Sequence, residues 1–370
     1  MSKTSILHLT YDMRIGGTEM VIKNLIEGSD SDLFDMSIFC IETPIGPWGI
    51  EMQNAGLAIT ATARKPGFDI SLIFAIRKHL KVNNIDLLHC HQYSPWVYSV
   101  LAAFGTKTNV IFTEHGRFYP DSSNWKRKLI NPWLARITKH ITAISQATKQ
   151  ALVDFENLPK ERIEVIYNGI QPLNVDPVKT LELKQKLKIP DNSLVLGTIA
   201  RLDPIKNHKM MLDAFLLVLK AHPDALLVIV GDGEEREKIN KHIQTLGLEK
   251  NVLMPGYDPQ PQHYLALMDI FLLSSLSEGT SMTLLEAMSL SKPCVVTDAG
   301  GNKEVIADGE NGIVTTNDDA IEFSQAILKL VNDKVLLNQY GAASQKRFSR
   351  LFDVSVMVKR LTNLYEERQS

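Results

Sequence analysis

The sequence is poor in cysteine and carries almost no net charge. Its three cysteines, Cys40, Cys90 and Cys294, lie far apart in apolar stretches and form no CxxC pair. This pattern excludes a disulfide scaffold and predicts buried, reduced thiols in a cytosolic protein. Forty basic side chains stand against 42 acidic ones, for a formal charge of -2. No overall positive field would therefore attract nucleic acid, and we expect no nucleic-acid partner.

Long hydrophobic runs are absent as well. No stretch approaches the 18 uninterrupted apolar residues of a membrane span, and the first residues lack the basic and apolar regions of a signal peptide. We therefore expect a cytoplasmic protein. Hydrophobic residues make up 44% and charged residues 22% of the chain, which is ordinary for a globular protein. At 370 residues the chain exceeds what one core usually serves, which predicts two domains.

Short apolar runs alternate with amphipathic segments along the whole chain. This rhythm predicts two parallel α/β sheets, each covered by helices on both faces. A stretch with one glycine and two prolines, Asn168–Pro177, predicts the linker between them. The strands expected are Ile6–Thr10, Met36–Ile41, Leu87–His91, Val110–Thr113, His140–Ile144, Leu194–Ile199, Leu226–Val230, Ile270–Leu273 and Pro293–Thr297. The helices expected are Thr18–Glu27, Ile70–Lys81, Lys126–Thr138, Lys209–Lys220, Glu234–Leu246 and Met282–Ser289.

The fold class that follows is α/β, with two Rossmann-like domains facing each other across a cleft. The carboxyl ends of the strands in both sheets should face that cleft, because open α/β sheets bind ligands there. Candidate site residues are therefore sought directly after the predicted strands.

The segment Ser277–Pro293 is the richest in chemistry. Glu278 precedes a predicted helix that Thr280 or Ser281 can cap, and Glu286 lies roughly 7–8 Å beyond the helix start. The N–H groups between the two carboxylates form an anion site. A sugar, a diphosphate and a ribose would fit along this line. The other interpretation is an ordinary helix with one N-terminal glutamate and one surface glutamate.

Cations and glycines follow other strands. Arg201 and Lys206 come after Leu194–Ile199 and can clamp a diphosphate, or can line a solvated loop. Gly231 can bring backbone close to a ligand, although a lone GxG is weak evidence. Gly16 and Gly17 either approach a phosphate or make a turn.

Histidines follow two strands of the first half. His115 and Arg117 come after Val110–Thr113, and His91 ends Leu87–His91, so all three are expected at the cleft. His89 and His91 are two residues apart, as in some metal sites. No third ligand with zinc-like spacing accompanies them, so we expect no metal site.

Taken together, these segments resemble the retaining GT-B glycosyltransferases of glycosyltransferase family 4. The most specific part is Glu278-x7-Glu286, supported in order by GGTE, TEHG, IYNGI, ARLDPIKNH, VIVGDGEE and AGGNKEVI. The resemblance implies catalytic roles for Glu278, His115, Arg201 and Lys206, and places His91 and Arg117 on the acceptor side. It implies donor binding by Gly16, Gly17, Arg201, Lys206, Gly231, Gly279, Thr280, Ser281, Met282, Thr283 and Glu286.

The resemblance also implies the reaction. A sugar would move from a nucleoside-diphosphate sugar, UDP favoured over GDP, to a glycan or lipid-linked acceptor in cell-envelope polysaccharide or lipopolysaccharide synthesis. Neither a metal nor a cofactor is expected. Residues 1–170, with a helix at 354–370 crossing back, would bind acceptor, and residues 171–353 would bind donor. This chain reads Glu-Gly-Thr-Ser where many members read Glu-Gly-Phe-Gly, which leaves the donor sugar open.

Two other functions stay open beside a transferase. A non-hydrolysing UDP-sugar 2-epimerase has the same two-domain architecture and ligand class, although the context of Glu278 and Glu286 fits it poorly. A nucleotide-sugar-binding protein that has lost its activity is the second. Intact Arg201 and Lys206 argue against that.

Positive charge gathers in the first half of the chain. Between Arg64 and Lys139 there are twelve lysines and arginines but four acids. Within Asn124–Lys139, three consecutive cations (Lys126, Arg127 and Lys128) lie beside Trp125 and Trp133. Such a helix suits peripheral contact with an anionic membrane, here the inner face. The alternative is a solvated helix with its tryptophans packed inward.

Overall fold

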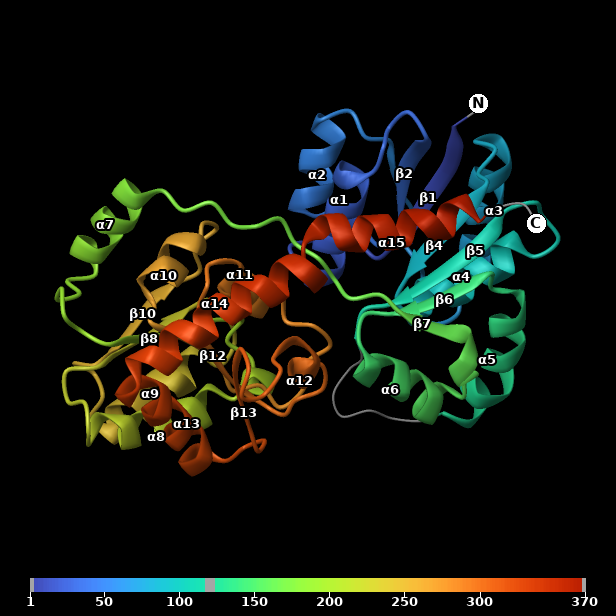
Figure 1. Ribbon diagram of the computed structural model, residues 1–370. Helices are drawn as coiled ribbons and strands as arrows, with labels where there is room; N and C mark the ends of the chain where they lie inside the picture. The colour runs from blue at the N-terminus through green and yellow to red at the C-terminus, as the bar shows by residue number, and fades with distance from the viewer. Residues whose placement is uncertain (1–2, 117–123, 368–370) are drawn as a thin grey trace. The chain divides into compact units, whose positions relative to one another are not determined.

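The chain divides into two units, each built on one parallel sheet. The computed structural model describes residues 3–116 and 124–367. The first unit ends at Gly169 and resumes at Val354, and the second is Ile170–Asp353. Each unit is a Rossmann-like α/β domain, as predicted, and Figure 1 shows helices flanking both sheets.

The first unit has a seven-stranded sheet in the order β3-β2-β1-β4-β5-β6-β7, with every pair parallel. Its strands are β1 Thr4–Thr10, β2 Phe34–Cys40, β3 Ile59–Ala61, β4 Leu87–His91, β5 Asn109–Glu114, β6 His140–Ala143 and β7 Ile163–Val165. Its helices are α1 Gly17–Gly28, α2 Pro47–Asn54, α3 Ile70–Val82, α4 Tyr93–Ala103, α5 Trp125–Ile137, α6 Gln146–Glu156 and α15 Val354–Glu366, with a 3-10 turn at Lys160–Arg162.

The second unit has a six-stranded sheet in the order β10-β9-β8-β11-β12-β13, again parallel throughout. Its strands are β8 Val195–Ile199, β9 Leu226–Val230, β10 Val252–Gly256, β11 Ile270–Leu273, β12 Cys294–Thr297 and β13 Gly312–Thr315. Its helices are α7 Pro177–Lys186, α8 His208–Leu219, α9 Arg236–Leu246, α10 Gln262–Leu267, α11 Met282–Ser289, α12 Asn302–Val305, α13 Ala320–Asn332 and α14 Lys334–Leu351, with a 3-10 turn at Pro204–Lys206.

Helix starts are fixed by side-chain caps that the sequence supplies. Asp69 accepts the N–H groups of Ser71 and Leu72 at the start of α3, and Asp319 caps α13 in the same way. Asp176 caps α7, whose first residue is Pro177. Proline suits that position because the first N–H of a helix has no intrahelical partner. The predicted linker Asn168–Pro177 accordingly ends where α7 begins.

Each sheet is buried between apolar faces. Trp96 and Phe112 stack within the first core, and Phe215 and Phe323 lie fully buried in the second. The three cysteines are free and buried, as predicted. Within the described residues, every helix is too short or too polar to cross a membrane.

The strand orders mark where ligands should bind. In the first unit the direction of winding changes between β1 and β4, and in the second between β8 and β11. The loops that leave the carboxyl ends of two such strands diverge and leave a crevice. The residues that follow β8 and β11 are therefore the first to inspect.

Candidate active site

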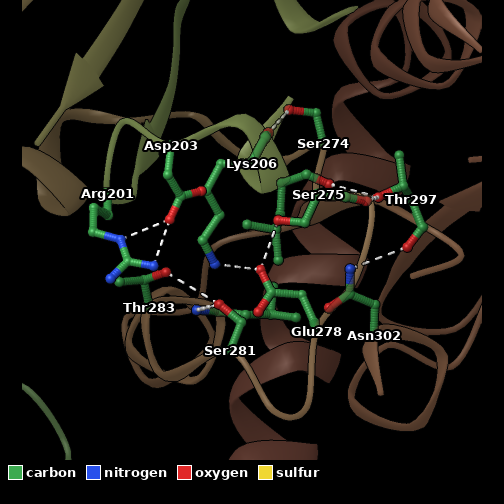
Figure 2. A network of polar contacts seen from close by, with 12 residues as sticks. Arg201, Asp203, Lys206, Ser274, Ser275, Glu278, Ser281, Thr283, Thr297 and Asn302 are labelled. Atoms are coloured by element: carbon green, nitrogen blue, oxygen red, sulfur yellow. Dashed lines mark hydrogen bonds and ion pairs between the residues drawn. The ribbon is translucent and has the colours of Figure 1, made fainter. Parts of the chain in front are cut away.

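The loops after β8 and β11 meet through one ion pair. Lys206 Nζ lies 2.6 Å from Glu278 Oε1, and the Ser275 hydroxyl donates to the same oxygen at 2.6 Å. Figure 2 shows the lysine extending across the loop toward the carboxylate. Both side chains are largely buried, with exposed fractions of 19% for Lys206 and 9% for Glu278. The structure therefore brings together Lys206 of the predicted diphosphate clamp and Glu278, the first of the two predicted carboxylates.

A second cation of the same loop is held at the surface. Arg201 donates through Nε and Nη2 to one oxygen of Asp203, both at 2.6 Å. The arginine side chain is 76% exposed, whereas that of Asp203 is 13% exposed. Asp203 therefore tethers a guanidinium that still presents further N–H donors outward. The sequence did not single out Asp203, although it stands two residues beyond Arg201.

Hydrogen bonds to main-chain atoms fix these two loops. The Ser274 hydroxyl donates to the carbonyls of Lys206 and Asn207, at 2.8 and 3.1 Å. The Thr297 hydroxyl donates to the Ser275 carbonyl at 2.6 Å, and Asn302 in turn donates to the Thr297 carbonyl (Figure 2). These contacts hold in place the two loops that carry Lys206 and Glu278.

Gly300 permits the closest of these approaches. Its φ is +55°, and a Cβ there would lie 2.0 Å from the carbonyl oxygen of Glu278. The N–H of Gly301 donates to that same oxygen at 3.0 Å. Any side chain at position 300 would push the Glu278 backbone away. The AGGNKEVI motif contained this glycine, but only the structure shows what it touches.

Helix α11 begins immediately after this pair. Ser281 caps it by accepting the N–H of Leu284 at 3.4 Å and also hydrogen-bonds Thr283, which confirms one of the two predicted caps. Gly279 and Thr280 form the turn from Glu278, and Met282 and Thr283 are the first helical residues. The first-turn N–H groups give this end a partial positive charge next to Lys206.

Glu286 lies inside α11 and is buried. It is 8% exposed, and its Oε2 atom has no hydrogen-bond partner within the described residues. Burial raises the pKa of this carboxyl to about 7. A surface glutamate, the alternative interpretation, is therefore wrong for Glu286. A buried acceptor without a donor is costly, and a ligand hydroxyl would satisfy it.

The glycines after β9 pack against the arginine loop. A Cβ at Gly231 would lie 1.9 Å from the carbonyl oxygen of Ala200, and one at Gly233 would lie 2.3 Å from that of Leu202. Leu202 N donates to Asp232 O at 2.9 Å, which joins the two loops. Contact between loops thus explains why position 231 is glycine. Its predicted donor contact stays a prediction.

The first unit carries the other predicted residues. Gly16 caps α1 and Gly17 is its first residue, with no side-chain hydrogen bond to the cap. His115 follows β5 and is half-buried, and its Nε2 lies 2.9 Å from Nδ1 of His91. Arg117 lies outside the described residues.

His91 lies inside the first unit. The residue is fully buried, and its two ring nitrogens face His8 and His115 at 3.1 and 2.9 Å. It therefore lies behind His115, and its predicted acceptor contact stays a prediction. Nitrogens of His8, His89 and His91 lie within 4.8 Å of one another. Sequence spacing did not predict His8 as a third member of this group, because it stands 83 residues before His91.

The second Rossmann-like unit gathers two cations, a helix N-terminus and a buried carboxylate near its switch point. Two family models match: "Glycosyltransferase Family 4" over residues 15–172 and "Glycosyl transferases group 1" over residues 179–347. The chain belongs to the GT4-type family of glycosyltransferases and has the GT-B fold. Neither model describes an epimerase.

Named relatives are bacterial glycosyltransferases. The chain is 26% identical to the UDP-Gal:alpha-D-GlcNAc-diphosphoundecaprenol alpha-1,3-galactosyltransferase of Escherichia coli, over 98% of this chain and 97% of that one. It is 28% identical to a diphospho-undecaprenol 4-alpha-N-acetylgalactosaminyltransferase of Campylobacter jejuni, over 93% and 94%. HepE of Anabaena, solved with UDP, superposes with a TM-score of 0.87 at 22% identity, over 98% and 100%. The same protein has been solved with UDP-glucose.

The raised pKa of Glu286, together with its predicted contact to the nucleotide, predicts that nucleotide binding depends on pH. Hydroxyl groups donate more strongly to an ionised carboxylate, so binding should favour the charged form. The affinity for UDP should therefore rise as pH increases through about 7, roughly tenfold for each unit by which binding lowers the pKa. Calorimetric titration of UDP between pH 6 and 8.5 measures this.

Glu286→Gln is the matched control, because it keeps the shape of the side chain and the titration of the nucleotide's own phosphates. The variant should bind more weakly at pH 8 and show a flatter profile. An identical pH profile in the two proteins would contradict the assignment of Glu286 to the nucleotide.

Proposed function

We propose that this glycosyltransferase is retaining and metal-independent, and that it moves a sugar from a UDP-sugar, or less favourably a GDP-sugar, to a glycan or lipid-linked acceptor. The observation that carries the proposal is the row of groups along α11. The Lys206–Glu278 pair lies before its first turn, and the buried, unpaired oxygen of Glu286 lies within it. Two carboxylates with an anion site between them match a sugar, a diphosphate and a ribose.

The charge chemistry needs no metal in this scheme. Departure of a nucleoside diphosphate develops negative charge on its outer phosphate. Lys206, Arg201 and the N-terminus of α11 support the proposal, because positive groups of this kind would stabilise that charge. Glu278 then contacts hydroxyls of the transferred sugar, and Glu286 accepts from the ribose. Retention of configuration follows from the family rather than from any distance in the structure.

The relatives support the choice of donor and acceptor. The printed name of the Escherichia coli relative gives a UDP-sugar donor and a lipid-linked acceptor, and the Campylobacter jejuni relative also acts on a diphospho-undecaprenol acceptor. HepE binds UDP and UDP-glucose. We propose that this chain also acts in the biosynthesis of cell-envelope polysaccharide or lipopolysaccharide, on the cytoplasmic side. The second unit would bind donor, and the first unit would bind acceptor.

We further propose that the first unit binds an anionic membrane through α5. Four apolar residues of this helix are well exposed: Trp125 (69%), Leu129 (70%), Ile130 (52%) and Trp133 (45%). Phe104 extends this α5 apolar face, with its ring centroid 5.8 Å from that of Trp133. Tryptophans packed inward, the alternative interpretation, are therefore wrong. Interfacial aromatic side chains beside cations are typical of helices that lie in a membrane surface.

The cations around this face are Lys126, Lys128 and Arg136, all exposed. Arg127, predicted to join them, turns inward instead. It lies 3.1 Å from the buried carboxylate of Glu156 and 4.7 Å from the centroid of the Tyr93 ring. The buried carboxylate needs a counter-charge, which explains why Arg127 pairs with it, although 43% of the arginine side chain remains exposed.

Transfer is tested with a panel of UDP- and GDP-sugars and a diphospho-undecaprenol-linked saccharide as acceptor. We expect turnover that survives EDTA, with the anomeric configuration of the donor kept in the product by NMR. Arg201→Ala should lower turnover roughly 10²–10³-fold, as for loss of a preorganised charge stabiliser. Arg360→Ala, which breaks a surface pair with Glu164, is the control and should leave turnover unchanged. Epimerised donor formed without acceptor, or activity lost in EDTA and restored by manganese, would overturn the proposal.

Membrane contact is tested by co-sedimentation with vesicles of phosphatidylglycerol and phosphatidylcholine, and with phosphatidylcholine alone. We expect binding to the anionic vesicles only, weakened by salt. Trp125→Ser with Leu129→Ser should abolish it, whereas Val335→Ser, an exposed apolar residue of the second unit, should not. Lys126→Gln and Lys128→Gln should each cost about 1 kcal/mol. Equal binding to both vesicle types, or none, would remove the membrane part and leave the transferase.

A further inference from the structure

A row of polar side chains crosses the buried interior of the first unit. His8 on β1 pairs in register with His89 on β4, and His91 pairs with Thr113 on β5. Residues paired in register on parallel strands share a face, and His89 and His91 alternate back to the same face. All four are between 0 and 4% exposed. Burial of so many polar groups in a sheet core is costly unless each is hydrogen-bonded.

One branch of this row is closed. His89 Nδ1 lies 2.6 Å from the Tyr365 hydroxyl of α15, and its Nε2 lies 2.7 Å from the Thr113 hydroxyl. Thr113 continues to the Thr142 hydroxyl at 2.6 Å. Each of these groups has a neighbour that can donate or accept, so this branch ties α15 to the sheet.

The other branch leads out to the predicted site. His8 Nδ1 lies 3.1 Å from His91 Nε2, and His91 Nδ1 lies 2.9 Å from His115 Nε2. We call these three rings the histidine chain. Its two ends, Nε2 of His8 and Nδ1 of His115, are buried atoms without a partner in the part of the chain that the structure describes. The histidine chain therefore connects a closed interior to the one histidine that the family resemblance places at the sugar.

Burial keeps all three rings neutral. It lowers the pKa of His8 and of His115 to about 3, and that of His91 well below its ordinary value. A neutral imidazole has one N–H and one lone pair, so each bond of the histidine chain needs a donor on one ring and an acceptor on the next. The three rings must then share one tautomer: either every Nδ1 carries the proton, or every Nε2 does.

We propose that His91 and His8 are positioning residues that hold His115 as the Nδ1–H tautomer. His8 Nε2 decides between the two arrangements. Protonated, it would be an N–H without an acceptor inside the sheet core, where His8 is fully buried, whereas His115 lies at the end of β5 and is half-buried, so an N–H at that end costs less. With Nδ1 protonated on every ring, His8 donates to His91 and His91 donates to His115. The remaining N–H is then the outer one of His115.

A metal is the competing interpretation of the same histidines. Nitrogens of His8, His89 and His91 are close enough to ligate one ion. However, both nitrogens of His89 and both of His91 already lie within 3.1 Å of hydrogen-bonding partners, and these partners would have to be released. The hydrogen-bonded chain accounts for more of the geometry.

The test uses 15N-histidine-labelled protein and long-range 1H–15N spectra, which report which ring nitrogen carries the proton. Asparagine places its amide where Nδ1 of histidine stands, and glutamine places it where Nε2 stands. His91→Asn therefore keeps a donor for His115, whereas His91→Gln keeps only the bond to His8. His8→Leu removes the inner end. His89→Leu is the matched control: its ring packs 4.2 Å from that of His91, but it belongs to the other branch.

We expect an Nδ1–H tautomer for His115 in the wild type, in His91→Asn and in His89→Leu. His91→Gln should shift His115 toward Nε2–H, and His8→Leu should change its 15N shifts although the two rings do not touch. Circular dichroism and unchanged UDP affinity establish that each variant is folded. Where the leucine variants do not fold, the asparagine and glutamine pair decides. An Nε2–H tautomer in the wild type, or the same His115 spectrum in His91→Asn and His91→Gln, would overturn the proposal.

Kinetics add a readout that rests on the proposed function. His91→Gln should lower kcat roughly 10- to 100-fold, the usual size for loss of an orienting hydrogen bond, with KM for the nucleotide sugar little changed. His91→Asn should restore most of the loss. Because tautomers are read without substrate, absence of transferase activity would refute the proposed function but not the histidine chain. If zinc addition changed the 15N shifts of His8, His89 and His91 together, these residues would form a metal site and the proposed histidine chain would be wrong.

Discussion

The Lys206–Glu278 ion pair is the interaction on which the candidate active site depends. It joins the loops that leave β8 and β11, the two strands between which the winding of the second sheet reverses. Such loops diverge, and a charged pair at 2.6 Å, with Ser275 on the same oxygen, fixes one point between them. Neighbouring contacts hold this ion pair in place. Gly300 packs closely against the Glu278 carbonyl, and the Ser274 hydroxyl donates to the Lys206 carbonyl. A cation and a carboxylate are thus oriented before any ligand arrives, which is how preorganised electrostatic sites avoid reorganisation during reaction.

The two units solve the problem of buried polar groups in different ways. In the second unit, one oxygen of Glu286 has no donor among the residues that the structure describes, and the cost of burial shows as a raised pKa. Such a carboxyl is suited to a ligand that brings its own hydroxyls. In the first unit, His91 is bonded to both His8 and His115 while all three rings remain neutral, and the cost of burial shows as lowered pKa values. Because the rings are neutral, each one fixes which nitrogen of the next carries the proton, and no charge is transferred.

The sequence predicted local features well and distant contacts poorly. Strands β4, β9 and β11 and helix α11 have the predicted bounds, because continuous apolar runs and a serine cap define them. Short strands such as β3 and β7 were missed, since three residues carry no periodicity. The contact of His91 with His8 was not predicted, because the 83 residues that separate them hide it. The ion pair of Arg127 with Glu156 was not predicted, because Glu156 lies on another helix.

The most direct test of the account is a double-mutant cycle on Lys206 and Glu278, with calorimetric binding of UDP-glucose and of UDP to wild type, Lys206→Ala, Glu278→Gln and the double variant. If the pair holds the donor as one unit, the two losses in UDP-glucose binding should be coupled by roughly 0.5–3 kcal/mol. Glu278→Gln alone should spare UDP, which lacks the sugar that this carboxylate contacts. Losses that add to within about 0.3 kcal/mol, or equal losses for the two ligands in Glu278→Gln, would contradict the account.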